Sequence, residues 1–420
     1  MYPEFFISLS GNSGTSTLMV IIKEFLRNNY MWIIFLVLVS AGSLSAELIN
    51  GRMEMVDLEV YYTAAERLVS GGELYRTVED DPYEHYVYKY SPPAAILFVP
   101  FIPLGLTLSK YLYWVLLTLI LGVVLYTLKR IFLGNEPINS RITVSFILGI
   151  IIIGTHFFRE LHLGQVNLLL LGLYVYALAL LDKHKAAGFG ALIAISIFIK
   201  PFGLIFIPLL IIMGRFRELL YFSAFTVLMF FAPMVFYSDP GEYFSLFSSW
   251  FQELSIELGD KQELVSAGNH TIFSILARYT PLAMIPLTGA GQLIYQLITI
   301  LILALILLWF YLKSGGSDRA ARLYIILIAM IPLLAFTSYN AFIFTLPLVV
   351  YLLFKFREMT LFFKIVFVIS CLLIGGNIYD VVGSKLFDFF WSISVFSWGT
   401  IGLLFVMFAG RNKLHLKMSL

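Results

Sequence analysis

The chain has 420 residues, of which 60% are hydrophobic and 13% are charged, and its mean hydropathy is +0.89. About a quarter of the residues of a soluble domain are charged, so this composition excludes a soluble globular protein and indicates a polytopic membrane protein. The formal net charge is only +2, and we therefore expect no nucleic-acid partner.

Apolar runs that are long enough, or nearly long enough, to cross a membrane core of about 30 Å recur along the chain. They lie at 31–48, 110–128, 142–157, 163–181, 187–200, 202–214, 219–237, 283–312, 322–337, 341–354, 361–376 and 387–409. The sequence therefore predicts an all-α membrane protein with about twelve transmembrane helices.

Two apolar stretches do not fit a simple span. The segment 94–107 contains Pro100 and Pro103, so we expect a short helix that enters the outer interface of the membrane and returns. The pair of short runs at 187–200 and 202–214 is split by Lys200 and Pro201, which predicts a hairpin of half-length helices.

The distribution of basic residues predicts the orientation of the chain in the bilayer. Most of the 28 Lys and Arg residues lie in one set of alternate loops, which the positive-inside rule places in the cytoplasm. Both termini would then be cytoplasmic, and two long loops, 49–109 and 238–281, would be external. We treat residues 1–420 as one integral membrane domain of a bacterial or archaeal plasma membrane.

The first external loop is the most polar part of the N-terminal half, because carboxylates crowd between Glu54 and Glu84. Apolar residues recur within it at helical spacing, and acidic residues lie on the other side. This pattern predicts an amphipathic helix on the membrane surface. The apolar residues are Leu58, Tyr61, Tyr62, Ala65 and Leu68, and the acidic ones are Glu59, Glu66 and Glu73.

Asp57 lies at the predicted start of this helix and has two interpretations. It could cap the helix N-terminus, where its carboxylate would accept backbone N–H bonds. It could instead be a general base that takes a proton from a hydroxyl group at the membrane surface. Glu59 is two residues away, and in an extended chain the two carboxylates could hold a divalent cation, whereas in a helix they diverge.

Polar residues at the outer ends of later helices are candidates for binding an anionic head group. Arg159, His162, Gln165 and Asn167 occupy one tight turn, which is either a snorkelling arginine with a helix-capping pair or a polar pocket. Lys200 either snorkels to the outer surface or binds a lipid phosphate. Arg278 and Lys89 qualify for phosphate binding by the same reasoning.

An ordered set of short motifs resembles a known family. The set is Asp57, Tyr61-Tyr62-x-Ala64-Ala65, Gly71-Gly72, Tyr75, Tyr90-Ser91-Pro92-Pro93, Gly164-Gln165-Val166-Asn167, Lys200-Pro201 and Gly268-Asn269. In order and spacing it is similar to the polyprenyl-phosphate-mannose-dependent mannosyltransferases of glycosyltransferase family 87, which are membrane enzymes of the GT-C class. The resemblance covers about residues 50–350.

The resemblance implies inverting transfer of a sugar from a polyprenyl phosphate on the outer side of the membrane. It implies that Asp57 is the base and that Gln165, Asn167 and Lys200 line the donor or acceptor cleft. One departure concerns the ninth predicted helix, where the family pattern Ser-Trp-x-His is replaced by Ser338-Tyr339-Asn340-Ala341. His162 and His270 are candidates to replace the missing histidine.

We therefore expect a membrane glycosyltransferase that transfers mannose or a related hexose or pentose to a glycolipid or cell-envelope glycan. Asp57 would be catalytic, and the donor phosphate or acceptor would be bound among Lys89, Arg159, His162, Gln165, Asn167, Lys200, Asn269, His270, Arg278 and Glu59. We expect no required cofactor, because a lipid phosphate is already a competent leaving group, although a divalent cation is compatible. The alternatives are a transporter or flippase of lipid-linked glycans and a glycan polymerase or ligase.

Overall fold

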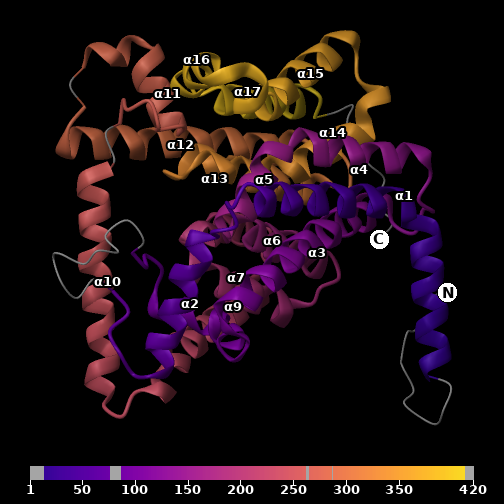
Figure 1. Ribbon diagram of the computed structural model, residues 1–420. Coiled ribbons are helices and arrows are strands. Elements are labelled where there is room, and N and C mark those ends of the chain that lie inside the picture. The colour runs from indigo at the N-terminus through magenta and orange to yellow at the C-terminus, as the bar shows by residue number, and fades with distance from the viewer. Residues whose placement is uncertain (1–13, 76–86, 262–263, 286, 412–420) are drawn as a thin grey trace.

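The computed structural model describes residues 14–75, 87–261, 264–285 and 287–411. Within these ranges every regular element is a helix, which confirms the all-α fold (Figure 1). The first half contains α1 Gly14–Ile49, α2 Val56–Val69, η1 Pro92–Leu104, α3 Gly105–Leu133, α4 Ser140–Ile152, α5 Gly154–Leu163, α6 Asn167–Asp182, α7 Ala186–Ile199, η2 Pro201–Phe206, α8 Ile207–Ile212, α9 Phe216–Phe231 and η3 Ala232–Phe236. The second half contains α10 Pro240–Lys261, α11 Ile272–Tyr279, η4 Pro281–Met284, α12 Gly289–Lys313, α13 Arg319–Leu334, η5 Tyr339–Thr345, α14 Leu346–Lys355, η6 Phe356–Glu358, α15 Leu361–Gly375, α16 Tyr379–Ser392 and α17 Val395–Ala409.

The described helices support a multi-pass integral membrane protein. Five of them are long and apolar enough to cross a bilayer, and the number rises to seven if each of two bent helix pairs forms one span. Several predicted spans correspond to apolar helices of 10–17 residues, such as α6, α7 and α15. About 20 residues are needed to cross the hydrocarbon core. The expected number of about twelve spans is therefore not confirmed.

Apolar side chains lie both in the core and on the outer surface. Every residue of α14 is buried, and so is every residue of α13 between Ala321 and Leu333. By contrast, α12 exposes its apolar side chains, among them Leu293, Leu297 and Leu301, each more than half exposed. Such a surface would aggregate in water and is stable against lipid. The core helices α13 and α14 are therefore enclosed by helices with lipid-compatible faces.

The predicted amphipathic helix is present as α2, but its apolar face contacts protein and not lipid. Its five periodic apolar side chains are all at least 93% buried. Tyr61 lies 4.8 Å from Phe98 of η1 between ring centroids, and the Tyr62 hydroxyl donates to the carbonyl of Ile102 at 3.2 Å. The helical period is thus confirmed, and protein covers the apolar face that was expected to contact the membrane. Four acidic residues of the first predicted external loop lie outside the described residues, namely Glu79, Asp80, Asp81 and Glu84.

The proline-containing segment forms a 3-10 helix, η1, after which the chain reverses. Phe98 and Tyr113 are 15 residues apart, and a continuous α-helix would separate them by about 22 Å. Their ring centroids are instead 6.2 Å apart, because the chain bends at Gly105, where φ is 70° and ψ is 156°. The apolar stretch Pro92–Leu133 is therefore not one straight span, and η1 packs between α2 and α3.

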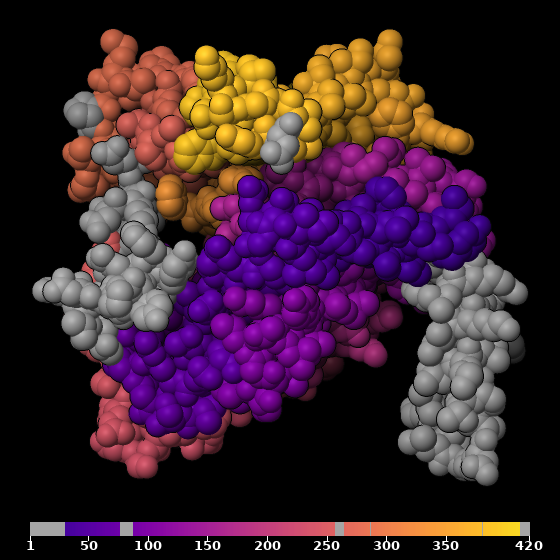
Figure 2. All heavy atoms as spheres, viewed as in Figure 1, coloured from indigo at the N-terminus to yellow at the C-terminus, as the bar shows by residue number. Residues whose placement is uncertain are grey.

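Opposite sides of the molecule are formed by different parts of the chain. In the space-filling view the orange to yellow C-terminal segment forms one side, and the segment that contains α2 forms the other (Figure 2). α10 runs along one edge, nearly perpendicular to α12 in this view (Figure 1). Asp57, Gln165, Asn167 and Lys200, four of the functional candidates of the sequence, meet on the α2 side, between α2, α5 and η2.

Candidate active site

Asp57 lies in the first turn of α2 but does not cap it. The N-cap residue is Met55, and no side chain accepts a hydrogen bond from the helix N-terminus there. The Asp57 carboxylate instead accepts a hydrogen bond at Oδ2 from the Gln165 side-chain amide. Glu59 points elsewhere and pairs with Lys110 at 3.4 Å while half exposed. The two carboxylates therefore diverge, as expected for a helix.

The turn between α5 and α6 brings Gln165 to Asp57. α5 ends at Leu163, and Gly164 adopts the left-handed conformation that commonly ends helices, with φ of 67°. A Cβ on Gly164 would lie only 2.8 Å from the Cβ of Leu58, so the turn packs directly against α2. The Tyr113 hydroxyl also holds the turn, because it donates to the backbone carbonyl of Gln165 at 3.1 Å.

Glu160 is a fully buried carboxylate behind this turn. It accepts hydrogen bonds from the Asn167 side-chain amide at 2.7 Å, from the Leu168 backbone N–H at 3.0 Å and from the Asn340 side-chain amide. Leu168 lies in the first turn of α6, where the helix dipole favours a negative charge. A buried carboxylate is costly without such partners. Glu160 thus ties α5, α6 and η5 together at the site.

Lys200 reaches the same place from the α7–η2 hairpin. Proline disfavours a helical conformation at the residue before it, so α7 ends at Ile199 and Lys200 is extended, with φ of −144° and ψ of 136°. Its ammonium group donates to Asn167 Oδ1 at 2.8 Å and lies 5.8 Å from the centroid of the Tyr90 ring. Lys200 therefore points into the protein, which favours the binding pocket over snorkelling.

These residues form what we call the Asp57 cluster, defined as Asp57, Tyr90, Glu160, Gln165, Asn167, Lys200 and Asn340. Burial raises the pKa of Asp57 above its ordinary value, while the hydrogen bond from Gln165 and the positive charges of Lys200, Arg159 and Lys89 lower it. The carboxylate is therefore a stronger base than a solvated aspartate. The cluster combines a group that can take a proton with an ammonium group that can bind an anion.

Arg159 and Lys89 flank the cluster, whereas His162 lies to one side of it. The Arg159 guanidinium lies 6.0 Å from the centroid of the Tyr339 ring. Lys89 is half-buried, and its carbonyl accepts a hydrogen bond from the Trp250 indole at 3.0 Å. His162 Nδ1 contacts the buried carboxylate of Glu47 at 2.7 Å, which joins this histidine to the end of α1.

Asn269, His270 and Arg278 form a separate group against the junction of α16 and α17. Arg278 donates to the carbonyls of Ser392 at 2.6 Å and Asn269 at 3.2 Å, and also to the Ser394 hydroxyl. His270 Nδ1 contacts the Ser394 hydroxyl at 3.1 Å. These contacts join α11 to the C-terminal helices. A role of these residues in phosphate binding stays a prediction.

The segment that departs from the family pattern lines the cluster through Asn340. Ala341, at the position of the missing histidine, is buried in η5. Of the two proposed replacements, His270 lies against this segment, with its ring 6.1 Å from that of Phe342. His156, which the sequence analysis did not select, lies at the same distance from Phe342.

Sequence reasoning missed Glu160, Asn340 and the role of Tyr90. The sequence could have identified Glu160 as a candidate, since it is an acidic residue beside a tight turn between two apolar runs. Asn340 carried no such signal, because its partner is 180 residues away in the chain.

Apolar outer helices and a polar cluster that combines a carboxylate with an ammonium group define a polytopic membrane protein with a candidate site. Residues 88–338 match the family model of glycosyltransferase family 87, and the chain therefore belongs to this family of GT-C membrane glycosyltransferases. The match includes Tyr90, Glu160, Gln165, Asn167 and Lys200, and it begins after Asp57. Searches of the curated proteins and of the solved structures returned no significant match.

Proposed function

We propose that this glycosyltransferase transfers a hexose or pentose, such as mannose, from a polyprenyl-phosphate donor to a glycolipid or glycan acceptor, with Asp57 as general base. The observation that carries the proposal is that Asp57, held by Gln165, interacts electrostatically with the Lys200 ammonium. The cluster draws on α2, the α5–α6 turn, the α7–η2 hairpin and η5. A base and a phosphate-binding cation are the two groups that such a transfer needs.

The reaction is a single displacement that inverts the anomeric carbon. The acceptor hydroxyl oxygen forms a bond to that carbon as its proton passes to the Asp57 carboxylate. The bond between the anomeric carbon and the phosphate oxygen breaks, and polyprenyl phosphate leaves with the electron pair. No metal ion is needed in this scheme, because the lipid phosphate is a competent leaving group.

Lys200 is suited to hold the departing phosphate. An ammonium group has three N–H donors, and the hydrogen bond to Asn167 uses one of them. Negative charge accumulates on the phosphate as the bond breaks, so a positioned cation stabilises the transition state more than the ground state. Arg159 and Lys89 add positive charge around the same carboxylate. We place this site at the outer face of the membrane, following the distribution of basic residues.

The test is sugar transfer from synthetic polyprenyl-phosphate sugars to membrane lipid extracts by wild type and Asp57→Asn. We expect the transfer rate of the variant to be about 10²–10⁴-fold lower than that of the wild type, because this factor is the usual contribution of a general base. Glu59→Gln is the matched control, because this acidic residue lies two positions away and is half exposed. It should retain the wild-type rate.

Each outcome separates the alternatives. Equal rates for wild type and a folded Asp57→Asn variant would show that Asp57 is not the base. Absence of transfer with every donor, combined with movement of a lipid-linked glycan across vesicles that contain the protein, would favour a transporter. The donor that supports the fastest transfer identifies the sugar.

A further inference from the structure

A cavity lies away from the Asp57 cluster. It has a volume of about 690 Å³ and is formed by α4 and α15, with the end of α14 and η6 completing it. This volume is within the range of about 300–1,000 Å³ that ligand pockets have. None of the residues that line it belongs to the Asp57 cluster. We call it the α4–α15 groove.

The walls of the groove are apolar and face outward. Val144 and Ile151 of α4 and Leu372 of α15 line it, with exposed fractions of 52%, 55% and 64%. α4 and α5 together form one of the bent pairs that can make a span. In a bilayer these walls therefore contact lipid chains, and an apolar groove at this depth is filled by one of them.

One end of the groove is closed by direct backbone contact. A Cβ on Gly375 would lie 2.2 Å from the carbonyl oxygen of Ile152, and both residues line the groove. Because only glycine fits there, α4 and α15 touch at this point. There is no room for a headgroup at this contact, so the headgroup of a chain lying in the groove fits at the opposite end.

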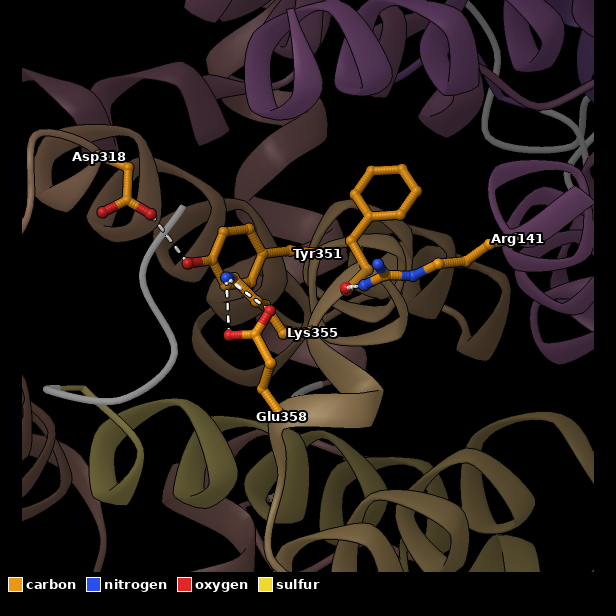
Figure 3. A network of polar contacts seen from close by, with 6 residues as sticks. Arg141, Asp318, Tyr351, Lys355 and Glu358 are labelled. Carbon is orange, nitrogen blue, oxygen red and sulfur yellow. Dashed lines mark hydrogen bonds and ion pairs between the residues drawn. The ribbon is translucent and has the colours of Figure 1, made fainter. Parts of the chain in front are cut away.

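That opposite end is basic. Arg141 and Arg357 line it and are exposed, and the Lys364 ammonium lies 5.6 Å from the ring of Phe356 in the same wall. The nearby Glu358 carboxylate is paired with Lys355, whose ammonium group donates to both carboxylate oxygens at 2.9 Å (Figure 3). Arg141 donates to the carbonyl of Phe354, which fixes it at the entrance (Figure 3). The entrance thus has an excess of positive charge.

We propose that the α4–α15 groove binds an anionic glycerophospholipid. One acyl chain lies between α4 and α15, and the headgroup phosphate contacts Arg141 and Arg357, whose planar guanidinium groups suit phosphate. Arg141 lies in the first turn of α4, whereas Gln165 follows α5. If this bent pair crosses the bilayer, the lipid belongs to the leaflet opposite the Asp57 cluster. The site is therefore distinct from the donor site of the proposed function and does not depend on it.

The experiment is native mass spectrometry of the full-length protein in detergent, incubated with phosphatidylglycerol or phosphatidylcholine of identical acyl chains. Wild type should retain phosphatidylglycerol preferentially. Arg141→Gln combined with Arg357→Gln should reduce that preference by about tenfold, because each basic side chain near a membrane surface attracts anionic lipid. Leu148→Trp, which fills the groove at a lining residue, should lower retention of both lipids.

Arg130→Gln combined with Arg217→Gln is the matched control, since both arginines are exposed and neither lines the groove. If this control loses the preference for phosphatidylglycerol as much as the Arg141 and Arg357 variant does, general surface charge explains the effect and the proposal is overturned. Unchanged retention in Leu148→Trp would overturn it as well, and this variant keeps the test decisive if the double arginine variant does not fold. Displacement of the lipid by inorganic phosphate alone would indicate a free-phosphate site. Stronger retention of polyprenyl phosphate that Leu148→Trp abolishes would indicate a prenyl-chain site in the groove, and either result would overturn the phospholipid assignment.

Discussion

Asp57 experiences opposing influences on its basicity. Burial disfavours the charged form and raises its pKa, whereas the amide of Gln165 and three nearby positive charges favour the charged form and lower it. A base must lose its proton to act and must hold the substrate proton afterwards. The balance between burial and hydrogen bonding therefore decides over which pH range Asp57 can work.

Replacing Gln165 by Leu should shift the pH dependence of transfer. The substitution removes an influence that lowers the Asp57 pKa, so this pKa rises further and the deprotonated form appears only at higher pH. The acidic limb of the kcat/KM profile should therefore move to higher pH, while the rate recovers on the alkaline side. Gln252→Leu, at an exposed glutamine of α10, is the control and should leave the limb in place. An unshifted limb in Gln165→Leu would show that another group titrates.

At the scale of elements, the site depends on where helices stop. α5 stops at Gly164, α7 stops before Lys200 and Pro201, and η1 turns into α3 at Gly105. Each break is made by glycine or proline, the two residues that most readily interrupt a helix. Gln165 follows the break at Gly164 and Lys200 lies at the break before Pro201, because a residue beyond a helix end is free to point toward a neighbouring element.

Two glycines with the same φ and the same pattern of backbone hydrogen bonds allow a matched test of this arrangement. Gly164 and Gly214 both have φ of 67°, but a Cβ would meet Leu58 at 2.8 Å in the first case and nothing within 4 Å in the second. Gly214→Ala should cost about 1–2 kcal/mol of stability from the left-handed conformation and keep activity. Gly164→Ala should cost a further 1–3 kcal/mol or so by overpacking and reduce transfer, because the turn carries Gln165. Thermal unfolding in detergent and the transfer rate measure both effects, and equal behaviour of the two variants would contradict the close packing of this turn on α2.

At the scale of the whole molecule, the arrangement of the chain across the bilayer follows from two properties. Long helices with exposed apolar faces, such as α9 and α12, require lipid around them. Basic residues concentrate in alternate connections, which predicts the cytoplasmic side. The turn after α3 and the helix α10 should then lie on opposite sides of the membrane.

Cysteine labelling tests this orientation directly, because the chain contains one native cysteine, Cys371, which can be replaced by Ser. In that background Asn135→Cys and Ser245→Cys introduce thiols at exposed positions after α3 and in α10. A membrane-impermeant maleimide should label Ser245→Cys in intact cells and label Asn135→Cys only after permeabilisation. The reverse pattern would invert the proposed orientation and place the Asp57 cluster on the cytoplasmic side.

The amino-acid sequence by itself determined the class of protein, the helical fold, the period of α2 and the turns that carry Gln165, Asn167 and Lys200. These features are local, since composition, helical spacing and glycine or proline breaks are properties of neighbouring residues. It did not determine how many apolar runs cross the membrane, because several of these runs form helices of only 10–17 residues, fewer than the about 20 that a span needs.

Only the tertiary structure decided that Asp57 meets Gln165, that η1 and not lipid covers α2, and that Asn340 reaches Glu160. It also separated Arg278 and His270 from the cluster, although the sequence grouped them with Lys200 as candidate phosphate ligands. The physical reason is that each of these contacts joins segments far apart in the chain. Side-chain packing and hydrogen bonding across such distances depend on the fold as a whole, which no local pattern encodes.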